Sequence, residues 1–407
     1  MVIDRYIPIV GNEVVDEIKL LSKYISGKVI QHINSTAVGG GVAEILNRLV
    51  PLFEDLGIKI YWDVIRGDST FFGITKKIHN ALHGKNLILT HRDIEYYNAI
   101  TQQNIKKMRF NGDVIVVHDP QPLGLIKAKK NNGSRWVWRC HVDVVRSKPN
   151  VWNFLVKEIV KYDRVIFSAP AFSKPLPIEQ VLIPPSIDPL SDKNKELDKK
   201  TIQGVLDKYK IEKNKPIITQ ISRYDFLKDP VGVIKAFKMV KKNFDCQLVL
   251  AGNVATDDPE HDKVLNAVKE EAGNDPDIHV LVIQPENNDI EVNALQRASD
   301  IILQKSIREG FALTVTEALW KAKPVVASNV GGIPLQITHK HSGILTHSIE
   351  GTAYWIKQLL SDPEYAKKLG ENGKEHIRHN FLITRHIRDY LLLFLSLYKK
   401  EDIVSLT

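Results

Sequence analysis

Short apolar runs alternate with longer amphipathic stretches through the first part of the chain. The run from Val29 to Asn34 predicts a strand, and apolar residues at helical spacing from Gly41 to Glu54 predict the helix that follows it. Five more runs of this kind predict strands at Lys59 to Val64, Leu87 to Thr90, Asp113 to His118, Arg135 to His141 and Arg164 to Ser168. Strands that alternate with helices indicate the α/β class, with a parallel, doubly wound sheet.

A second series of the same kind follows a proline-rich loop. The loop from Ile183 to Ser191 contains three prolines and precedes a charged run, which is typical of a domain junction. The strands predicted after it are Pro216 to Ser222, Gln247 to Gly252, His279 to Ile283, Asp300 to Gln304 and Pro324 to Ser328. The stretch from His376 to Lys400 carries Leu, Tyr and Ile at helical spacing, so we expect one or two helices that pack onto a domain.

Chain length indicates two domains. The 407 residues exceed the size at which one hydrophobic core usually keeps growing, so two domains of roughly 150 to 200 residues with a cleft between them are expected. Open parallel sheets bind ligands beyond the carboxyl ends of their strands. Functional residues are therefore expected in the loops that follow strands.

Net charge and cysteine content limit the possible partners and the cellular compartment, but they do not assign a function. The net charge of +8 is spread over the chain with no basic block, so we expect no nucleic-acid partner; an anionic small substrate and a merely basic surface both remain open. Cys140 and Cys246 lack the spacing of a disulfide framework or zinc site and fit a reducing cytosol. No signal pattern or long apolar run occurs, so a soluble, cytoplasmic protein without a membrane span is expected. Few Cys and Met beside many Lys, Glu and Ile would suit a thermophile.

Two polar clusters follow strands of the first series. Gly39, Gly40 and Gly41 open the first helix, so their amides can approach an anion or hydroxyl groups closely; they form neither a dinucleotide fingerprint nor a P-loop. His118 and Asp119 end one strand, and His141 ends the next on the same side of the predicted sheet. Such pairs can bind sugar hydroxyls. A tight turn and structural histidines are the alternatives.

Two cations follow the first strand of the second series. Arg223 ends this strand and Lys228 follows five residues later, so both can converge on one loop. Arg and Lys match phosphate oxygens and the negative charge that develops on a leaving group. Two solvated surface cations are the alternative.

The most informative segment runs from Arg308 to Glu317. Glu309 precedes Gly310, and a helix that begins near Leu313 carries Glu317, so the two carboxylates lie on the order of 12 Å or more apart. That distance approaches the hexose-to-ribose span of a nucleotide sugar, and the free amides at the helix N-terminus can receive the diphosphate between them. An ordinary helix with exposed glutamates is the alternative, as a simple turn is for Gly331 and Gly332.

These motifs together resemble retaining glycosyltransferase family 4, the large family that includes sucrose synthase. The resemblance covers nearly the whole chain and rests on Arg223 with Lys228, on R-E-G-F-A-L-T-V-T-E-A-L-W and on P-V-V-A-S-N-V-G-G-I-P. Within that family H-I-N-S-T-A-V-G-G-G-V-A-E-I-L, V-V-H-D-P-Q-P, W-R-C-H-V-D and I-P-P-S-I-D-P are most similar to the archaeal trehalose synthases and the related trehalose phosphorylases.

The resemblance implies a GT-B fold of two Rossmann-like domains that face each other across a cleft. Residues 1–185 would form the acceptor domain, 186–375 the nucleotide-sugar donor domain, and 376–407 helices that cross back to the first domain. Arg223 and Lys228 would hold the diphosphate, Glu309 the hexose and Glu317 the ribose, within a donor site that also includes Gly310, Phe311, Ala312, Leu313 and Thr314. Gly39 to Gly41, His118 and Asp119 would border the acceptor glucose, and His141 would lie near the donor sugar.

The activity implied by the resemblance is glucose transfer from an NDP-glucose, such as ADP- or UDP-glucose, to D-glucose, giving α,α-trehalose with retention. No carboxylate is placed as a nucleophile, so a front-face reaction is preferred, with Arg223, Lys228, Glu309 and His141 as catalytic residues. No cofactor or metal site is required, assistance by Mg²⁺ stays open, and the family implies a homodimer. The main rival is a trehalose phosphorylase that uses glucose 1-phosphate; another family transferase, an epimerase on the same fold and a sugar-responsive regulatory module are further alternatives.

Overall fold

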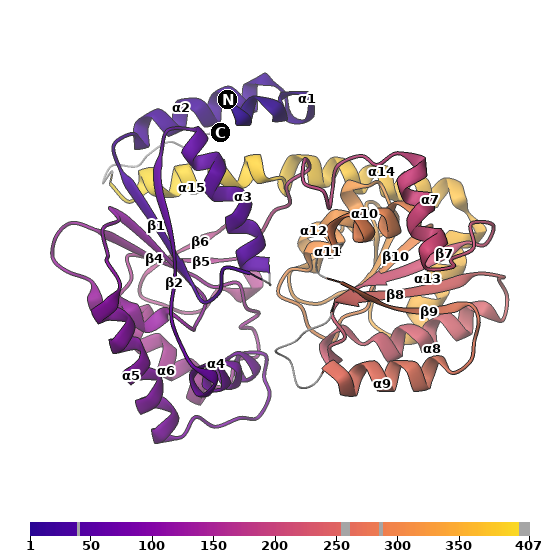
Figure 1. Cartoon of the computed structure of the whole chain (residues 1–407), viewed down its shortest axis with the longest axis horizontal. Coiled ribbons are helices and arrows are strands. Elements are labelled where there is room, and N and C mark those ends of the chain that lie inside the picture. Colours follow the sequence, from indigo (N-terminus) through magenta and orange to yellow (C-terminus); the bar gives the residue numbers. More distant parts are fainter. Residues whose placement is uncertain (39–40, 254–260, 285–287, 399–407) are drawn as a thin grey trace. The chain divides into compact units, whose positions relative to one another are not determined.

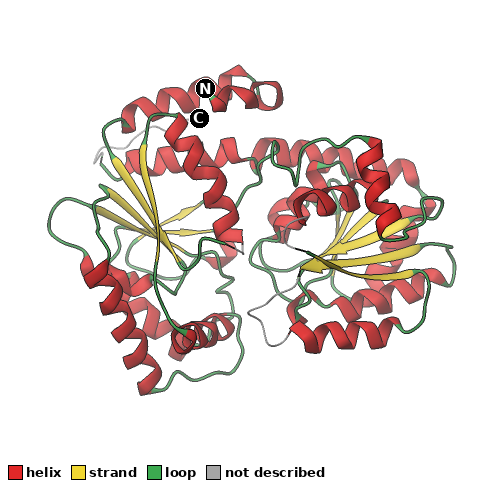
Figure 2. Ribbon diagram, viewed as in Figure 1, coloured by secondary structure: helices red, strands yellow, loops and turns green. Residues whose placement is uncertain are grey.

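The computed structural model describes residues 1–38, 41–253, 261–284 and 288–398. The chain divides into two compact units, one formed by 1–186 with 383–407 and the other by 187–382. Each unit contains one six-stranded sheet, and Figure 2 shows helices on both faces of each sheet. The predicted α/β class with parallel, doubly wound sheets is confirmed.

The sheet of the first unit has the strand order β2-β1-β3-β4-β5-β6, and all its pairs are parallel. Its strands are β1 (Val29–Asn34), β2 (Lys59–Val64), β3 (Val114–His118), β4 (Arg135–Arg139), β5 (Arg164–Phe167) and β6 (Glu179–Leu182). Its α-helices are α1 (Ile7–Val10), α2 (Asn12–Ile25), α3 (Gly41–Asp55), α4 (Ser69–Leu82), α5 (His91–Lys107), α6 (Pro149–Ile159) and α15 (Ile383–Ser396). Short 3-10 helices lie at Val2–Tyr6, Leu123–Ala128 and Pro170–Phe172. In Figure 1, α4, α5 and α6 cover one face, while α2, α3 and α15 cover the other.

The second unit contains a sheet of strand order β12-β11-β10-β7-β8-β9, again with parallel pairs. Its strands are β7 (Ile217–Ile221), β8 (Gln247–Asn253), β9 (Ile278–Ile283), β10 (Ile301–Gln304), β11 (Val325–Ser328) and β12 (Ile344–Thr346). Its helices are α7 (Lys199–Lys208), the 3-10 turn η4 (Phe226–Lys228), α8 (Pro230–Lys241), α9 (His261–Ala272), α10 (Asn288–Ala298), α11 (Leu313–Trp320), α12 (Ile333–Gln336), α13 (Ile349–Ser361) and α14 (Pro363–Asn380). Read from β9, the order is that of a dinucleotide-binding sheet.

One predicted strand is wrong and two strands were not predicted. Residues Leu87 to Thr90 are irregular: Ile88 is 74% exposed, and Thr90 caps α5 by accepting a hydrogen bond from the Asp93 amide at 3.1 Å. A run of only three apolar residues therefore links two helices here. β6 and β12 were missed because they are edge strands of four and three residues with little apolar pattern.

The C-terminal boundary also differs from the prediction. His376 lies inside α14, which continues to Asn380, so the chain leaves the second unit after Leu382 rather than at residue 375. The segment that returns to the first unit is α15, which packs against α2 and buries Ile387, Leu391 and Phe394. Among the described residues, no helix combines the length and apolar content needed to cross a bilayer.

Candidate active site

Strand order places the predicted site residues at one point in each sheet. β1 and β3 are neighbours in the first sheet, as β7 and β10 are in the second, so their following loops diverge at a switch point of the topology. Ligands of open α/β sheets bind at such points. His118 ends β3 and Asp119 follows it, while Arg223 and Lys228 follow β7 and Glu309 follows β10.

In the second unit, the predicted phosphate and sugar residues contact each other. Lys228 Nζ forms an ion pair with Glu309 Oε2, and both side chains are largely buried, with 17% and 11% exposed. Ser306 Oγ donates to Glu309 Oε2 at 3.3 Å, and the Gly310 amide donates to Glu309 Oε1 at 3.1 Å. The carboxylate is therefore oriented by three donors before any ligand binds.

Polar residues that the sequence did not single out join the two loops. Gln220 on β7 donates from Nε2 to the Lys228 carbonyl at 3.0 Å and accepts from the Lys305 amide at 2.8 Å. Lys305 Nζ pairs with Asp229, which caps α8. Gln220 and Lys305 thus hold Lys228 and Glu309 in register, and their roles become visible only once β7 and β10 are known to be neighbours.

The start of α11 is held in a strained conformation. Ala312, its N-cap residue, has φ 69° and ψ 76°, a left-handed conformation that is rare for a residue with a Cβ atom. Gln336 Nε2 donates to the Phe311 carbonyl, and Thr316 Oγ1 donates to Gln336 Oε1 at 2.7 Å. The loop is therefore fixed by buried contacts, as strained functional loops require.

Gly331 and Gly332 do not form a simple turn but pack against the backbone of this loop. A Cβ atom at Gly331 would lie 1.6 Å from the Glu309 carbonyl oxygen, and Gly331 has φ +57°. The Gly332 amide donates to the Gly310 carbonyl at 3.1 Å. Glycine is therefore required at Gly331 so that the backbone of the Glu309 loop can approach closely.

The remaining donor-site residues differ in exposure. Arg223 is 54% exposed and pairs only loosely with Asp225 at 3.4 Å, so its guanidinium is accessible to a ligand. Glu317 on α11 is 2% exposed. Lys321, one turn further on, donates to the Glu317 carbonyl at 3.2 Å, and burial lowers the pKa of its ammonium to about 7. Phe311 is buried, while Leu313 and Thr314 are half-buried.

In the first unit, the three predicted polar residues form one cluster. His118 Nδ1 lies 3.0 Å from His141 Nε2, and the two rings stack. Asp119 Oδ1 accepts from the His141 amide at 2.7 Å, while the Asp119 carbonyl accepts from Trp138 Nε1 at 3.0 Å. Asp119 has φ 66°, so this loop, like the one at Ala312, contains a left-handed residue.

Burial shifts the ionisation of this cluster. Desolvation holds the pKa of His118 and of His141 well below the usual range, and the nearby Arg139 guanidinium lowers both further. Desolvation also raises the pKa of Asp119 to about 6. At neutral pH the two imidazoles are therefore neutral and can act as hydrogen-bonding groups toward hydroxyls.

The glycine loop is described only in part. Gly39 and Gly40 lie outside the described residues, and Gly41 is the exposed first residue of α3. The loop before it is fixed to the neighbouring strand, because Asn34 donates to the Thr36 carbonyl at 2.7 Å and accepts from Trp62 Nε1 at 2.9 Å.

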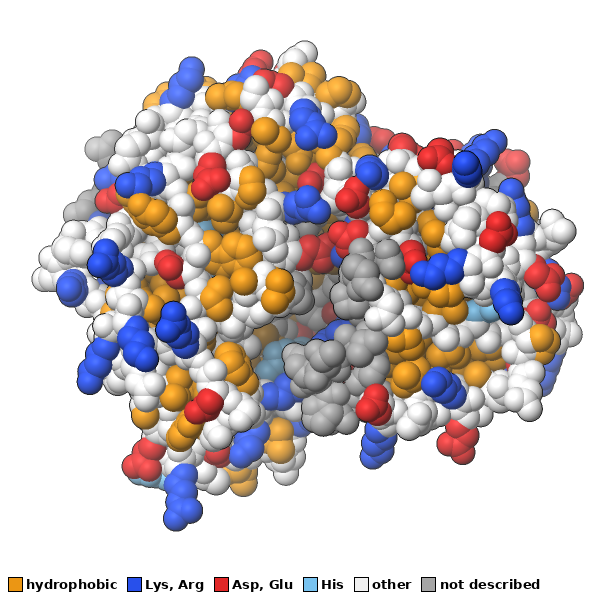
Figure 3. Space-filling model, in the orientation of Figure 1, with side chains coloured by type: hydrophobic (Ala, Val, Ile, Leu, Met, Phe, Trp, Pro, Cys, Tyr) orange, Lys and Arg blue, Asp and Glu red, His pale blue; other side chains and the backbone are white. Residues whose placement is uncertain are grey.

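Charged side chains of both signs are mixed on the surface in Figure 3. On the face drawn in Figure 3, Lys and Arg side chains are scattered among Asp and Glu rather than gathered in one stripe. Within the part of the chain that the structure describes, no three His, Cys, Asp or Glu side chains gather as ligands of a metal ion.

The fold and the gathered polar residues define a glycosyltransferase of the GT-B class. A UDP-forming α,α-trehalose-phosphate synthase from Burkholderia xenovorans shares this fold, with a TM-score of 0.70 and 17% identity over 91% of this chain and 98% of its own. Residues 32–174 match the family described as the N-terminal domain of trehalose synthase, and residues 204–376 match the group 1 glycosyl transferases.

The chain belongs to the trehalose synthase family. It is 43% identical to the trehalose synthase of Rubrobacter xylanophilus over 96% of each chain, and 42% identical to that of Pyrococcus horikoshii over 97% of this chain and 96% of the relative. A trehalose phosphorylase of Pleurotus pulmonarius is more distant, at 29% identity over 88% of this chain but only 56% of its own length. The predicted family and fold are confirmed.

Proposed function

We propose that this enzyme transfers glucose from an NDP-glucose, ADP- or UDP-glucose, to D-glucose and forms α,α-trehalose with retention. The observation that carries the proposal is the Lys228–Glu309 ion pair at the β7–β10 switch point, within a chain that is 43% identical to a trehalose synthase over nearly its whole length. A cation for the diphosphate and a carboxylate for hexose hydroxyls are the groups that a nucleotide sugar needs.

The donor would be held along the loop after β10 and the start of α11. Arg223 and Lys228 would bind the diphosphate, the amides at the start of α11 would add donors, and Glu309 would accept hydrogen bonds from hexose hydroxyls. Phe311 to Thr314 would line this path, and Glu317 would accept from the ribose diol. The accessible Arg223 guanidinium and the prearranged Glu309 carboxylate support this assignment.

The first unit would bind glucose. Asp119, with the loop from Gly39 to Gly41, would hold its hydroxyls, and His141 would lie near the transferred sugar. His118 was expected to contact the glucose directly, but its two ring nitrogens face His32 and His141, so it would act through His141. The hydrogen bonds among His118, His141 and Asp119 support this role because they fix these groups relative to one another.

Transfer would follow a front-face course. The anomeric hydroxyl of glucose attacks C1 of the donor sugar as the bond from C1 to the diphosphate oxygen breaks, and the hydroxyl proton passes to that oxygen. Arg223 and Lys228 stabilise the negative charge that develops on the departing NDP. Protein cations could meet that charge, so we propose that no metal is required and that Mg²⁺ is at most an aid; undiminished turnover in excess EDTA would support this point.

One assay separates the synthase from its rival. The protein is incubated with each NDP-glucose plus glucose, and separately with glucose 1-phosphate plus glucose, and trehalose is measured. Trehalose is expected from at least one NDP-glucose. Product only from glucose 1-phosphate would overturn the proposal in favour of a phosphorylase, the activity for which the Pleurotus relative is named.

We also propose that the enzyme works as a homodimer in the cytoplasm. The family resemblance supports the dimer, and the two free, buried cysteines suit a reducing compartment. Light scattering of the purified protein tests the oligomeric state, and a monomeric mass at micromolar concentration would contradict it.

A further inference from the structure

Three histidines from neighbouring strands form a continuous hydrogen-bonded chain. His32 lies on β1, His118 ends β3, and His141 follows β4. His32 Nδ1 is 2.9 Å from His118 Nε2, and His118 Nδ1 is 3.0 Å from His141 Nε2. This histidine chain thus runs from the core to the partly exposed His141 in the candidate active site.

The histidine chain ends in the core at His32. His32 is 0% exposed, and its Nε2 has no hydrogen-bond partner within the described part of the protein. Its ring stacks on His118 and meets the edge of Tyr390 from α15. A proton on Nε2 would therefore be buried without an acceptor.

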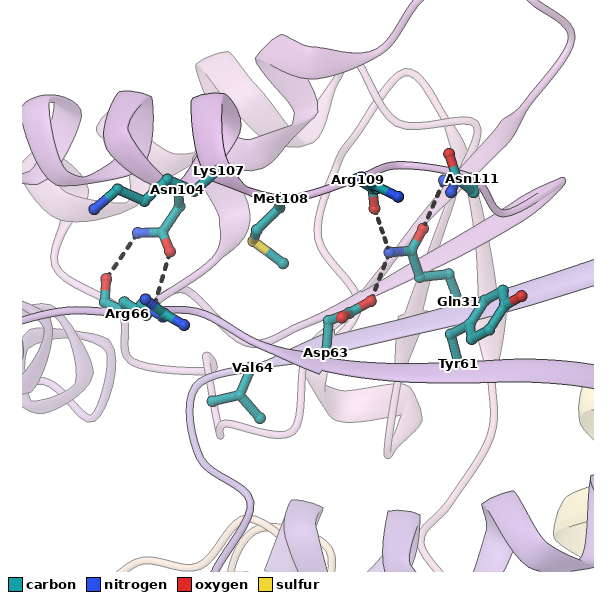
Figure 4. Close-up of a pocket in the computed structure, with 10 residues that line it drawn as sticks. All are labelled: Gln31, Tyr61, Asp63, Val64, Arg66, Asn104, Lys107, Met108, Arg109 and Asn111. Atoms are coloured by element: carbon teal, nitrogen blue, oxygen red, sulfur yellow. Dashed lines mark hydrogen bonds between the residues drawn. The ribbon is translucent and has the colours of Figure 1, made fainter.

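The strand β1 is anchored so that His32 faces this cluster. Its neighbour Gln31 points to the opposite face, where Figure 4 shows it in a cavity beside β2. Gln31 Nε2 donates to Asp63 Oδ2 at 2.7 Å and to the Arg109 carbonyl at 2.8 Å, while its Oε1 accepts from the Asn111 amide at 3.2 Å. These contacts fix the register of β1 and hence the position of the His32 ring.

The ionisation of the three rings is set by their surroundings. Burial lowers the pKa of His32 to about 3 and holds the pKa of His118 and His141 well below the usual range. Arg139 and His386 lie close enough to disfavour added positive charge in this cluster. Each ring is therefore neutral at pH 7 and carries one N–H.

One N–H per ring leaves two arrangements of the chain. If the protons point inward, His32 Nε2 carries an N–H that is buried without an acceptor, which costs about 1–3 kcal/mol. If they point outward, His32 Nδ1 donates to His118, His118 Nδ1 donates to His141, and His32 Nε2 is a bare ring nitrogen. Orphaned N–H groups are the rarer defect in protein interiors, so the outward arrangement is favoured.

We propose that His32 and His118 are positioning residues that fix His141 as the tautomer protonated at Nδ1. His141 Nε2 is occupied as the acceptor from His118, so Nδ1–H is the group that His141 presents to a ligand. The ligand group that matches it is an acceptor oxygen of a hexose hydroxyl. This inference deepens the proposed function and rests on it for the identity of the sugar, although the tautomer can be measured without it.

The direct test is nuclear magnetic resonance of the full-length protein with ¹⁵N-labelled histidine. His141 and His118 are assigned from the signals lost in His141→Asn and His118→Asn. Both rings are expected to be neutral and protonated at Nδ1. A wild-type His141 that is protonated at Nε2 overturns the inference, whether or not the protein makes trehalose, so its failure is distinct from failure of the proposed function.

Two substitutions of His32 test whether this residue fixes the tautomer of His141. The amide nitrogen of Asn occupies roughly the place of the imidazole Nδ1, so His32→Asn keeps a donor to His118, whereas His32→Leu removes it at similar bulk. In His32→Leu the His141 signal should become a mixture of tautomers, and kcat/KM should fall about tenfold, the loss expected for one hydrogen bond. In His32→Asn both should stay close to wild type.

A third variant separates a positioning role of His32 from a general effect on core packing. Ile33→Val alters the next residue of β1, which is fully buried and apolar, and should change neither the tautomer nor the pH profile of kcat/KM. Equal losses of kcat/KM in His32→Leu, His32→Asn and Ile33→Val would show that His32 contributes only core packing. The proposal that His32 fixes the tautomer of His141 would then be overturned.

Discussion

The Lys228 ammonium and the Glu309 carboxylate form an ion pair between the loops that follow β7 and β10. Both groups are more than four-fifths buried, so the ion pair is largely shielded from solvent. A diphosphate bound beside Lys228 would compete for that ammonium. The pair therefore holds the site in shape, and donor binding would redistribute its hydrogen bonds.

Removal of Lys228 is expected to slow the reaction and also to destabilise the second unit, because the Glu309 carboxylate is left buried without its cation. Lys228→Ala takes away the cation nearest the leaving group and should lower kcat by about 10²-fold or more, as loss of a prearranged electrostatic contact does. Initial rates of trehalose formation at saturating NDP-glucose measure this. The matched control is Lys238→Ala, which breaks the exposed Lys238–Glu271 pair and should leave kcat within twofold. A Lys228→Ala enzyme with wild-type kcat would refute the diphosphate role.

Glu317 is predicted to bind the donor ribose. Glu317→Ala should weaken the binding of NDP and of NDP-glucose by about tenfold, because two hydroxyl hydrogen bonds to a carboxylate are lost. Titration calorimetry with NDP-glucose measures the affinity, and glucose affinity serves as the internal control because glucose lacks the ribose. Unchanged donor affinity would remove the ribose contact from the assignment.

Local motifs could be predicted from the sequence, but their partners could not. Glu309, Lys228 and the start of α11 at Leu313 were all found from residue types and helical pattern. Their mutual contact depends on β7 and β10 being neighbours, although two strands separate them in the chain. Gln220 and Lys305 were missed for this reason, since a glutamine in an apolar strand carries no local signal.

The histidine chain shows the same limit. His118 and His141 were recognised because they lie at the carboxyl ends of predicted strands, whereas His32 lies within an apolar run and resembles an ordinary core residue. Its proposed role rests on a ring nitrogen that has no partner among the described residues and on the order β1-β3-β4, neither of which has a sequence signature. The opposite error occurred at Leu87 to Thr90, where an apolar run had no neighbouring strand to pair with.

Strain at Ala312 predicts a stabilising substitution. Glycine adopts positive φ without the Cβ clash that costs about 1–2 kcal/mol, and its extra freedom in the unfolded chain offsets part of the gain. Ala312→Gly should therefore raise the free energy of unfolding of the second unit by about 0.5–1 kcal/mol, measured by urea denaturation. Ala318→Gly, in the buried interior of α11, should instead lower it by about 1 kcal/mol. Destabilisation by both changes would show that the Ala312 methyl group contributes packing that outweighs its strain.

Protein stability is expected to fall steeply in acid because of the first unit. The pKa of His32, His118, His141 and His386 is lowered in the folded state by burial. The unfolded chain therefore binds more protons than the folded chain below about pH 6.5. Stability that is fully present above pH 6.5 is then lost as pH falls toward the folded-state values, by about 1.4 kcal/mol per pH unit for each histidine.

Charged groups around the cluster modify this slope. Arg139 and Arg385 face it and disfavour protonation further, whereas Tyr390 stays neutral. Asp119 acts in the opposite sense: its pKa is raised to about 6, so its ionisation destabilises the fold as pH rises from about 4 to 6. Four histidines outweigh this one carboxyl, so the net slope remains positive.

Urea denaturation between pH 4.5 and 7.5 tests the balance. His32→Asn should reduce the slope by up to about one proton and leave the rest, and Asp119→Asn should steepen it by removing the opposing group. Ile33→Val provides the control, since it changes a buried residue of the same strand without removing a titratable group and should leave the slope unchanged. A pH-independent stability over this range would mean that water reaches these imidazoles in the folded protein, and the neutral histidine chain would have to be abandoned.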